Sequence, residues 1–336
     1  MPTYSAIQVA PDGSLEATER ELVEPAPGHV RIRVEACGVC HSDSLAVHEH
    51  AASEIGRVPG HEAVGRIDAV GDGVGSWSIG DRVGVGYLGG HCGVCDRCRR
   101  GDFTGCTDQP ATGVTVDGGY AEVLYARQSG LVAIPDELSS IEAAPLLCAG
   151  FTTFNALRKA AAAPGDLVAV QGIGGLGHLG LQYARKMGAR VVAIARGTDK
   201  APLAKGLGAQ DYIDSRSVDP GKALQALGGA DVVLATAASG ASMTALVPGI
   251  ARGGRLMVVG ASFEPIEVSP ISLIFGDVTV GGSLTGSSIE NEDNLRFAAE
   301  NGVRAMIEEA PLADAAAAYA RMMDGDARFR MVLAIA

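Results

Sequence analysis

The sequence has 336 residues, which at about 150 residues per domain favours two domains, each long enough to bury its own core. Hydrophobic residues make up 47% and charged residues 20%, which excludes a disordered chain. The formal net charge of −12 offers no basic field, so we expect no nucleic-acid partner. No apolar run approaches the ~18 residues of a membrane helix, and the N-terminus lacks a secretory signal. We therefore expect a cytoplasmic protein without a membrane partner.

Residues 1–130 are predicted to be rich in strands and loops. Val30–Ala36 and Tyr120–Ala126 alternate apolar and polar residues, as half-buried strands do. Glycines interrupt Glu62–Gly71 at a spacing that disfavours a helix. This pattern predicts a β-rich first domain with long connecting loops.

From about Pro145 onward, predicted strands alternate with predicted helices, which is typical of a parallel sheet covered on both faces. The segment after Leu284 holds two helix patterns and the apolar strand Phe329–Ile335, and it breaks the alternation. We therefore expect this segment to return to the first domain. The predicted strands are Leu167–Gln171, Val191–Ala195, Asp231–Ala235, Gly254–Val259 and Val278–Leu284, and the predicted helices are Leu176–Met187 and Asp199–Leu207.

A glycine-rich loop follows the first of these strands and opens a helix. Its residues Gly172, Gly174, Gly175, Leu176 and Gly177 fit the pattern G-x-G-x-x-G. The first glycine permits a tight turn, the second lets the backbone approach a pyrophosphate, and the third allows close packing of helix and strand. The helix N-terminus stabilises the negative charge of that pyrophosphate. The loop predicts dinucleotide binding; the alternative is a tight turn without a ligand.

The end of the second strand bears on the choice between NAD and NADP. An acidic residue there would bind the ribose 2′-hydroxyl of NAD, but this strand ends in Ala195 and Arg196. Ala195 removes the repulsion that a carboxylate would exert on a 2′-phosphate, and Arg196 can pair with that phosphate. NADP is therefore favoured. The alternative is that Arg196 is a solvated charge and that Asp199 or water meets the ribose.

Four of the seven cysteines lie close together between residues 89 and 107. Their spacing, C-x2-C-x2-C-x7-C, suits a tetrahedral zinc ion bound by four thiolates. Such a site has no open position, so we expect it to be structural and not catalytic. An iron–sulfur cluster and a nucleic-acid-binding zinc ribbon are the alternatives. The four residues are Cys92, Cys95, Cys98 and Cys106.

Further metal-type residues are scattered: Cys40, His61 with Glu62, and Cys148. Each has an ordinary interpretation as well, because a cysteine in an apolar run is more often a buried small hydrophobe than a ligand. Cys37 lies within a strand pattern where burial explains it. Spacing alone does not bring these residues to one site.

The motifs as a set resemble those of the zinc-dependent medium-chain alcohol dehydrogenases. Residues 60–74 fit G-H-E-x2-G-x5-G-x2-V, and G-D-R-V follows at residues 80–83. The four-cysteine segment, Cys148-Ala-Gly and the glycine-rich loop come next in the same order as in that family. The resemblance extends from about Pro25 to the C-terminus.

The resemblance implies an α/β fold with a discontinuous first domain. A GroES-like β-rich catalytic domain would comprise residues 1–148 and 285–336, with the zinc lobe at about 89–107. A Rossmann domain with a doubly wound parallel sheet would comprise residues 149–284. The substrate would lie between the two domains.

The resemblance also implies two zinc ions per chain. Cys40, His61 and Cys148 would bind the catalytic ion, and the four clustered cysteines the structural one. Glu62 would be an inner-sphere or alternate ligand, and Asp43 would accept the other N–H of His61. The activity implied is that of an alcohol dehydrogenase or carbonyl reductase that transfers hydride to or from NAD(P).

Family roles carry over to four further positions. Ser42 would accept the alcohol proton, Thr152 would lie near the nicotinamide, and His41 and Arg330 would contact cofactor phosphates. Many members end the proton relay with a histidine three residues after the hydroxyl residue, where this chain has Leu45. His48 could replace it only if the loop folds back.

Three further expectations remain at the level of the sequence. By analogy with bacterial members of similar length, we expect a homo-oligomer, tetrameric or dimeric. The small-molecule alcohol, aldehyde or ketone is left open, because its pocket depends on loops such as Leu45–Ile55 and Leu284–Ile289. The alternative function is a non-catalytic, zinc-stabilised protein that binds or senses a nucleotide.

Overall fold

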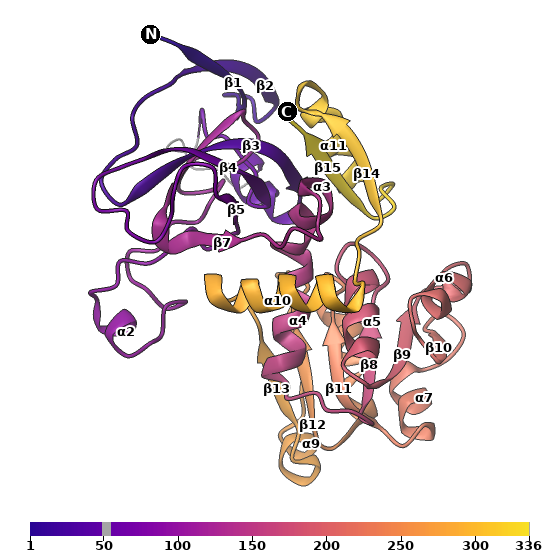
Figure 1. The fold of residues 1–336 in the computed structure, drawn as a ribbon. Helices are drawn as coiled ribbons and strands as arrows, with labels where there is room; N and C mark the ends of the chain where they lie inside the picture. Colours follow the sequence, from indigo (N-terminus) through magenta and orange to yellow (C-terminus); the bar gives the residue numbers. More distant parts are fainter. Residues whose placement is uncertain (49–54, 336) are drawn as a thin grey trace. The chain divides into compact units, whose positions relative to one another are not determined.

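The computed structural model describes residues 1–48 and 55–335, so most of the loop Leu45–Ile55 lies outside the described residues. The chain forms two compact units, one of Met1–Phe151 with Gly286–Ala336 and one of Thr152–Thr285. The chain thus leaves the first unit, completes the second, and returns (Figure 1). No helix among the described residues is long and apolar enough to cross a membrane.

The first unit contains a two-stranded sheet, β1–β2, and a seven-stranded sheet. The large sheet has the order β14-β15-β3-β4-β5-β7, and β6 also pairs with β3. Its pairs are antiparallel except for β14 with β15. The strands are β1 Thr3–Val9, β2 Leu15–Glu21, β3 His29–Val39, β4 Ala63–Val70, β5 Arg82–Val85, β6 Val123–Arg127, β7 Leu131–Ala133, β14 Ile307–Pro311 and β15 Arg330–Ala334.

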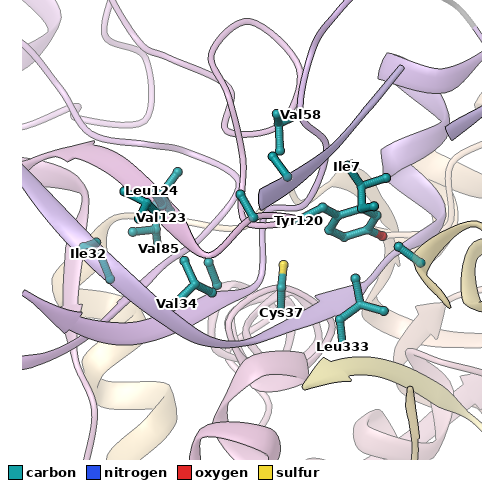
Figure 2. Close-up of a cluster of buried hydrophobic side chains, with 14 of the residues drawn as sticks. Ile7, Ile32, Val34, Cys37, Val58, Val85, Tyr120, Val123, Leu124 and Leu333 are labelled. Atoms are coloured by element: carbon teal, nitrogen blue, oxygen red, sulfur yellow. The ribbon is translucent and has the colours of Figure 1, made fainter. Parts of the chain in front are cut away.

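Strand β3 shows why this sequence forms a half-buried sheet. Val30, Ile32 and Val34 are at most 3% exposed, whereas Arg31 and Arg33 between them each bind a different oxygen of Asp68 on β4. Period-two alternation therefore separates an apolar face from a charged one. The apolar face joins a cluster that includes Ile7, Cys37, Tyr120 and Leu333 (Figure 2).

Short helices connect the strands of the first unit, and two longer ones belong to its C-terminal part. α10 begins with a capping box between Ser287 and Glu290 and ends at Gly302 in the left-handed conformation, so both ends are satisfied. The helices are η1 His41–Asp43, α1 Ser44–Val47, α2 Asp96–Arg99, η3 Gln128–Gly130, α3 Ser140–Ala143, η4 Ala144–Leu146, α10 Ser288–Asn301, η6 Leu312–Asp314 and α11 Ala315–Met323; α4 Ala149–Lys159 begins in the first unit and continues into the second.

The second unit is built on a six-stranded parallel sheet with the order β10-β9-β8-β11-β12-β13. This order runs outward in both directions from β8, which is the doubly wound arrangement. The strands are β8 Leu167–Gln171, β9 Arg190–Ala195, β10 Asp211–Asp214, β11 Ala230–Ala235, β12 Ile250–Val258 and β13 Thr279–Gly282. The helices are α5 Gly177–Lys186, α6 Ala201–Gly206, α7 Pro220–Ala226, α8 Gly240–Thr244, η5 Val247–Gly249 and α9 Pro270–Gly276.

Candidate active site and metal centres

Four scattered residues meet in the first unit. Donor atoms of Cys40, His61, Glu62 and Cys148 all lie within 4.8 Å of one another, and all four residues are buried. Sheet register brings the first three together, because Cys37 at the end of β3 pairs with Ala63 at the start of β4. Cys40 follows β3 and His61 precedes β4, so both lie at the same end of this strand pair. We call these four residues the donor cluster.

The returning C-terminal segment positions Cys148, the fourth member of the cluster. Asn291 and Asn294 on α10 are buried, and their amides donate to the carbonyls of Leu147 and Leu146 at 3.1 and 3.0 Å. These bonds fix the main chain immediately before Cys148. The sequence does not predict these bonds, because their partners lie more than 140 residues apart.

The donor cluster has the dimensions of a zinc site. The sulfurs of Cys40 and Cys148 are 3.9 Å apart, whereas a disulfide needs about 2.05 Å. Two sulfurs at about 2.3 Å from a tetrahedral ion are about 3.8 Å apart. His61 Nε2 is buried and has no hydrogen-bond partner within the described chain. Two thiols and one such nitrogen form the Cys2His donor set of a zinc site with an open position.

The two thiols of the donor cluster are unequal without a metal. Contact with Cys148 lowers the pKa of Cys40 well below its usual value, and contact with Cys40 raises the pKa of Cys148 well above it. Cys40 is therefore the more acidic thiol of the pair, and zinc binds cysteine as the thiolate. Binding of a divalent cation releases thiol protons, so metal affinity rises with pH.

Asp43 connects the donor cluster to the surrounding core. One carboxylate oxygen, Oδ1, lies 2.8 Å from His61 Nδ1. The other, Oδ2, accepts the backbone N–H of Cys40 at 2.9 Å and the hydroxyl of Tyr120 at 2.8 Å. With Nδ1 facing Asp43, Nε2 faces the cluster, which is the orientation a metal ligand needs. This geometry agrees with the role that the resemblance implied for Asp43.

Arg330 occupies a different environment from the one expected of a phosphate-binding residue. Its side chain is 4% exposed, and Nη2 lies 2.6 and 2.7 Å from the two oxygens of Glu62. Burial raises the pKa of Glu62 to about 7, although Arg330 opposes the rise. The structure thus assigns Arg330 as the counterion of Glu62, and its contact with cofactor phosphates stays a prediction.

The four remaining predicted ligands form a second cluster in the segment 89–107. Sγ of Cys106 lies 3.6 Å from that of Cys92 and 4.0 Å from that of Cys95, close to the edge of a zinc tetrahedron. Backbone N–H groups point at these sulfurs, and those of Cys98 and Thr107 lower the pKa of Cys95 to about 5. Cys98 completes the set. The geometry suits a closed site of four thiolates.

Ser42 and His48, the predicted proton-transfer residues, and His41, which is predicted to contact a cofactor phosphate, lie around the first turn after β3. His41 and Ser42 belong to η1; His41 is exposed and Ser42 is half-buried. His48 is exposed after α1, and its ring centroid lies 5.8 Å from that of Tyr319. The contact between His48 and Tyr319 gives no support to a relay through His48.

The second unit contains a cavity of about 750 Å³ at the carboxyl ends of β8, β9, β10 and β11. Three predicted cofactor residues line it: Gly172, Ala195 and Arg196. Ser215 and Arg216, which follow β10, line it too and were not predicted. In open parallel sheets this edge is the place where dinucleotides bind.

The glycine-rich loop has the backbone that its pattern predicts. Gly172 has φ +88°, which only glycine adopts without strain, and a Cβ on Gly177 would collide with the carbonyl oxygen of Gly172. Gly174, Gly175 and Leu176 complete the turn between β8 and α5. Thr152, on α4, is buried at the start of the second unit, and its contact with a nicotinamide stays a prediction.

Comparisons with known proteins agree with this arrangement. The family model of the alcohol dehydrogenase GroES-like domain matches residues 26–136, and that of the zinc-binding dehydrogenases matches residues 175–300. Alcohol dehydrogenase patD of Penicillium expansum is 42% identical over 95% of this chain and 94% of its own length. The chain belongs to the zinc-dependent medium-chain alcohol dehydrogenases. The resemblance inferred from the sequence motifs is thereby confirmed.

Two further relatives extend the similarity of this alcohol dehydrogenase. An alcohol dehydrogenase of Geobacillus stearothermophilus is 40% identical over 96% of each chain. The structure of a cinnamyl alcohol dehydrogenase of Sorghum bicolor superposes with a TM-score of 0.88 at 31% identity, covering 99% of this chain and 97% of the other. The protein is a zinc-dependent oxidoreductase of alcohols and aldehydes, and the non-catalytic alternative is not favoured.

Proposed function

We propose that this alcohol dehydrogenase holds a catalytic zinc ion with Cys40, His61 and Cys148 and a structural zinc ion with the four cysteines of residues 92–106. The observation that carries this proposal is the convergence of three buried donors, one of them the unpartnered Nε2 of His61. Metal analysis of the purified protein tests it. Two zinc ions per chain support the proposal, and one or none contradicts it.

A zinc ion at such a site polarises the oxygen of an alcohol or carbonyl group and lowers the pKa of the alcohol. In the protein, Asp43 orients the imidazole of His61 toward the ion, and Arg330 is the counterion of Glu62. We propose that Ser42, two residues after Cys40, takes the proton that the alcohol releases. We propose the same site for the reverse reaction with aldehydes or ketones.

The variant Ser42→Ala is expected to lower kcat by about 10²-fold, because general acid–base groups typically contribute 10²–10⁴-fold to the rate. Alanine at position 48 is expected to change kcat less than about threefold, since His48 is exposed and packs on Tyr319. Steady-state kinetics of Ser42→Ala and His48→Ala with a short alcohol measures both. An equal collapse of kcat in the two variants would contradict this assignment.

We further propose that the enzyme prefers NADP(H). Arg196 after β9 and Arg216 after β10 both line the cavity of the second unit, beside Ala195. The carboxylate of the neighbouring Asp214 accepts the backbone N–H groups of Gly197 and Arg216 at 2.7 and 2.9 Å. Two guanidinium groups in one cavity favour a phosphate over a hydroxyl.

The double variant Arg196→Ala/Arg216→Ala is expected to lower kcat/KM for NADPH by about 100-fold, because each hydrogen bond to a charged group contributes about 1.5–3 kcal/mol. With NADH the change should stay below about threefold. Arg190→Ala is a matched control, since Arg190 is an exposed residue at the opposite end of β9 and pairs with Asp211. Equal losses with both cofactors, or a wild-type preference for NADH, would overturn the proposal.

A homo-oligomer, dimeric or tetrameric, is also proposed, and the second unit offers a surface for it. α9 exposes Ile271, Ile274 and Phe275, each more than 60% exposed, and β13 is the last strand of its sheet. An apolar helix beside an unpaired strand edge suits contact with a second copy. Light scattering measures the mass directly.

We also propose a reducing compartment such as the cytoplasm. None of the seven cysteines, all of which lie among the described residues, forms a disulfide, which supports this proposal.

A further inference from the structure

Tyr120 is a buried tyrosine that has none of the catalytic roles proposed above. It is 0% exposed within the apolar cluster of the first unit, and burial raises the pKa of its hydroxyl well above the usual value. The hydroxyl therefore stays protonated and can donate a hydrogen bond. Figure 2 shows its ring among Ile7, Cys37 and Leu333, with the oxygen at the far end of the ring.

The main chain around Tyr120 is bonded to the segment that leads into His61. The N–H groups of Gly118, Gly119 and Tyr120 donate to the carbonyls of Val58, Gly60 and Pro59 at 2.7, 2.8 and 3.0 Å, in that order. These contacts fix residues 58–60, which come directly before the ligand.

The ring of Tyr120 also lies directly against Gly60. A Cβ on Gly60 would overlap this ring and would also lie 2.9 Å from Cys37 Sγ. Gly60 has φ +101°, so its place demands glycine on two grounds. Tyr120 therefore contacts the histidine loop with its ring as well as with its main chain.

The hydroxyl of Tyr120 is also connected to His61, through the carboxylate of Asp43. It donates to Asp43 Oδ2, which also accepts the N–H of Cys40, while Asp43 Oδ1 faces His61 Nδ1. Asp43 is 1% exposed, so contacts with the protein, and not with bulk water, orient its carboxylate. A hydrogen bond from a hydroxyl to a carboxylate is charge-assisted and strong.

We propose that Tyr120 is a positioning residue of the metal site: its hydroxyl holds the Asp43 carboxylate so that His61 presents Nε2 to the zinc ion. The proposal rests on the proposed zinc site of Cys40, His61 and Cys148. The side chain of Tyr120 thus has two roles: its ring packs in the core, and its hydroxyl acts through Asp43.

Tyr120→Phe keeps the ring and removes only the oxygen. Groups that orient metal ligands typically contribute 10–100-fold to metal affinity, and Tyr120 acts one bond further out, so we expect zinc to bind about tenfold more weakly. Chelator competition measures the zinc affinity of both proposed sites. The zinc ion that Cys148→Ala fails to bind is the one of the donor cluster. The zinc affinity of the four-cysteine site should be unchanged in Tyr120→Phe.

Tyr125→Phe is the matched control. Tyr125 belongs to β6 in the same unit, but its hydroxyl bonds the backbone of Val23 far from any metal ligand. This variant should retain both zinc ions with wild-type affinity. Substitution with Co²⁺ adds a readout besides activity: the visible bands of the donor-cluster site should shift in Tyr120→Phe and not in Tyr125→Phe.

A double-mutant cycle with Asp43→Asn tests whether Tyr120 acts through Asp43. In the Asp43→Asn background, Tyr120→Phe should weaken zinc binding less than about twofold. Additive effects, unchanged affinity in the single variant, equal weakening of both zinc sites, or a Tyr120→Phe protein that does not fold would each overturn the proposal. A wild-type protein that binds no zinc in the donor cluster would instead contradict the proposed function.

Discussion

Cys148→Ala is expected to lower kcat/KM for alcohol oxidation by about 10³-fold or more. Loss of one thiolate leaves the donor cluster with too few ligands to hold zinc, and a metal ion contributes several kcal/mol to such a transition state. Since about 1.4 kcal/mol corresponds to a factor of ten, the loss of about 4 kcal/mol gives this magnitude. The variant should retain one zinc ion per chain and should still bind NADPH, because the cofactor cavity belongs to the second unit.

Cys37→Ala provides the control for this experiment. Cys37 is 0% exposed in the same unit, and its sulfur lies 3.6 Å from the carbonyl of Gly38 and outside both donor groups. This variant should keep two zinc ions and most of its activity. If Cys148→Ala retained turnover, or if Cys37→Ala lost zinc to the same extent, the assignment of ligands would be wrong.

Arg330→Met is expected to lower the free energy of unfolding of the first unit by about 3–5 kcal/mol. Removing one partner of a buried ion pair is strongly destabilising, because Glu62, which is 0% exposed, must then lie charged without a counterion or take up a proton. The double variant Glu62→Gln/Arg330→Met should regain much of the loss, since no buried charge remains. Urea unfolding followed by tryptophan fluorescence measures the effect, because the single tryptophan, Trp77, lies in the first unit.

Arg321→Met shows the size of an effect without burial. Arg321 pairs with Glu308 at 2.6 Å, as closely as Arg330 pairs with Glu62, but its side chain is 47% exposed. Exposed pairs contribute about 0–1 kcal/mol, so this variant should unfold at nearly the same urea concentration as the wild type. A loss in Arg330→Met as small as that in Arg321→Met would show that the buried pair does not stabilise the unit.

Local patterns predicted a large part of the fold. Strand β8 was predicted with its observed ends, and β9, β11 and α5 within a residue or two, because buried runs and glycine turns are local signals. The strands β10 and β14 were missed. Asp211–Asp214 and Ile307–Pro311 are short, and acidic residues interrupt their alternation, so their pairing partners decide their structure.

The site divides in the same way. The spacing of the four cysteines in residues 92–106 is local, so the sequence itself points to the four residues that the structure brings together. The contacts of Arg330 with Glu62 and of Tyr120 with Asp43 span 268 and 77 residues. No sequence spacing encodes them. The first follows from strand register, because Met331 pairs with Val39, which places Arg330 beside Cys40. Arg216 was missed for a similar reason, since it follows the unpredicted strand β10.

The late position of β15 has a consequence for synthesis on the ribosome. Domains tend to fold as they emerge, and all of residues 152–285 are translated before Arg330. Until then the carboxylate of Glu62 lacks its counterion, and the edge of β3 at residues 36–39 is open to foreign strands. We therefore expect a nascent chain to complete its second unit before β15 closes the first.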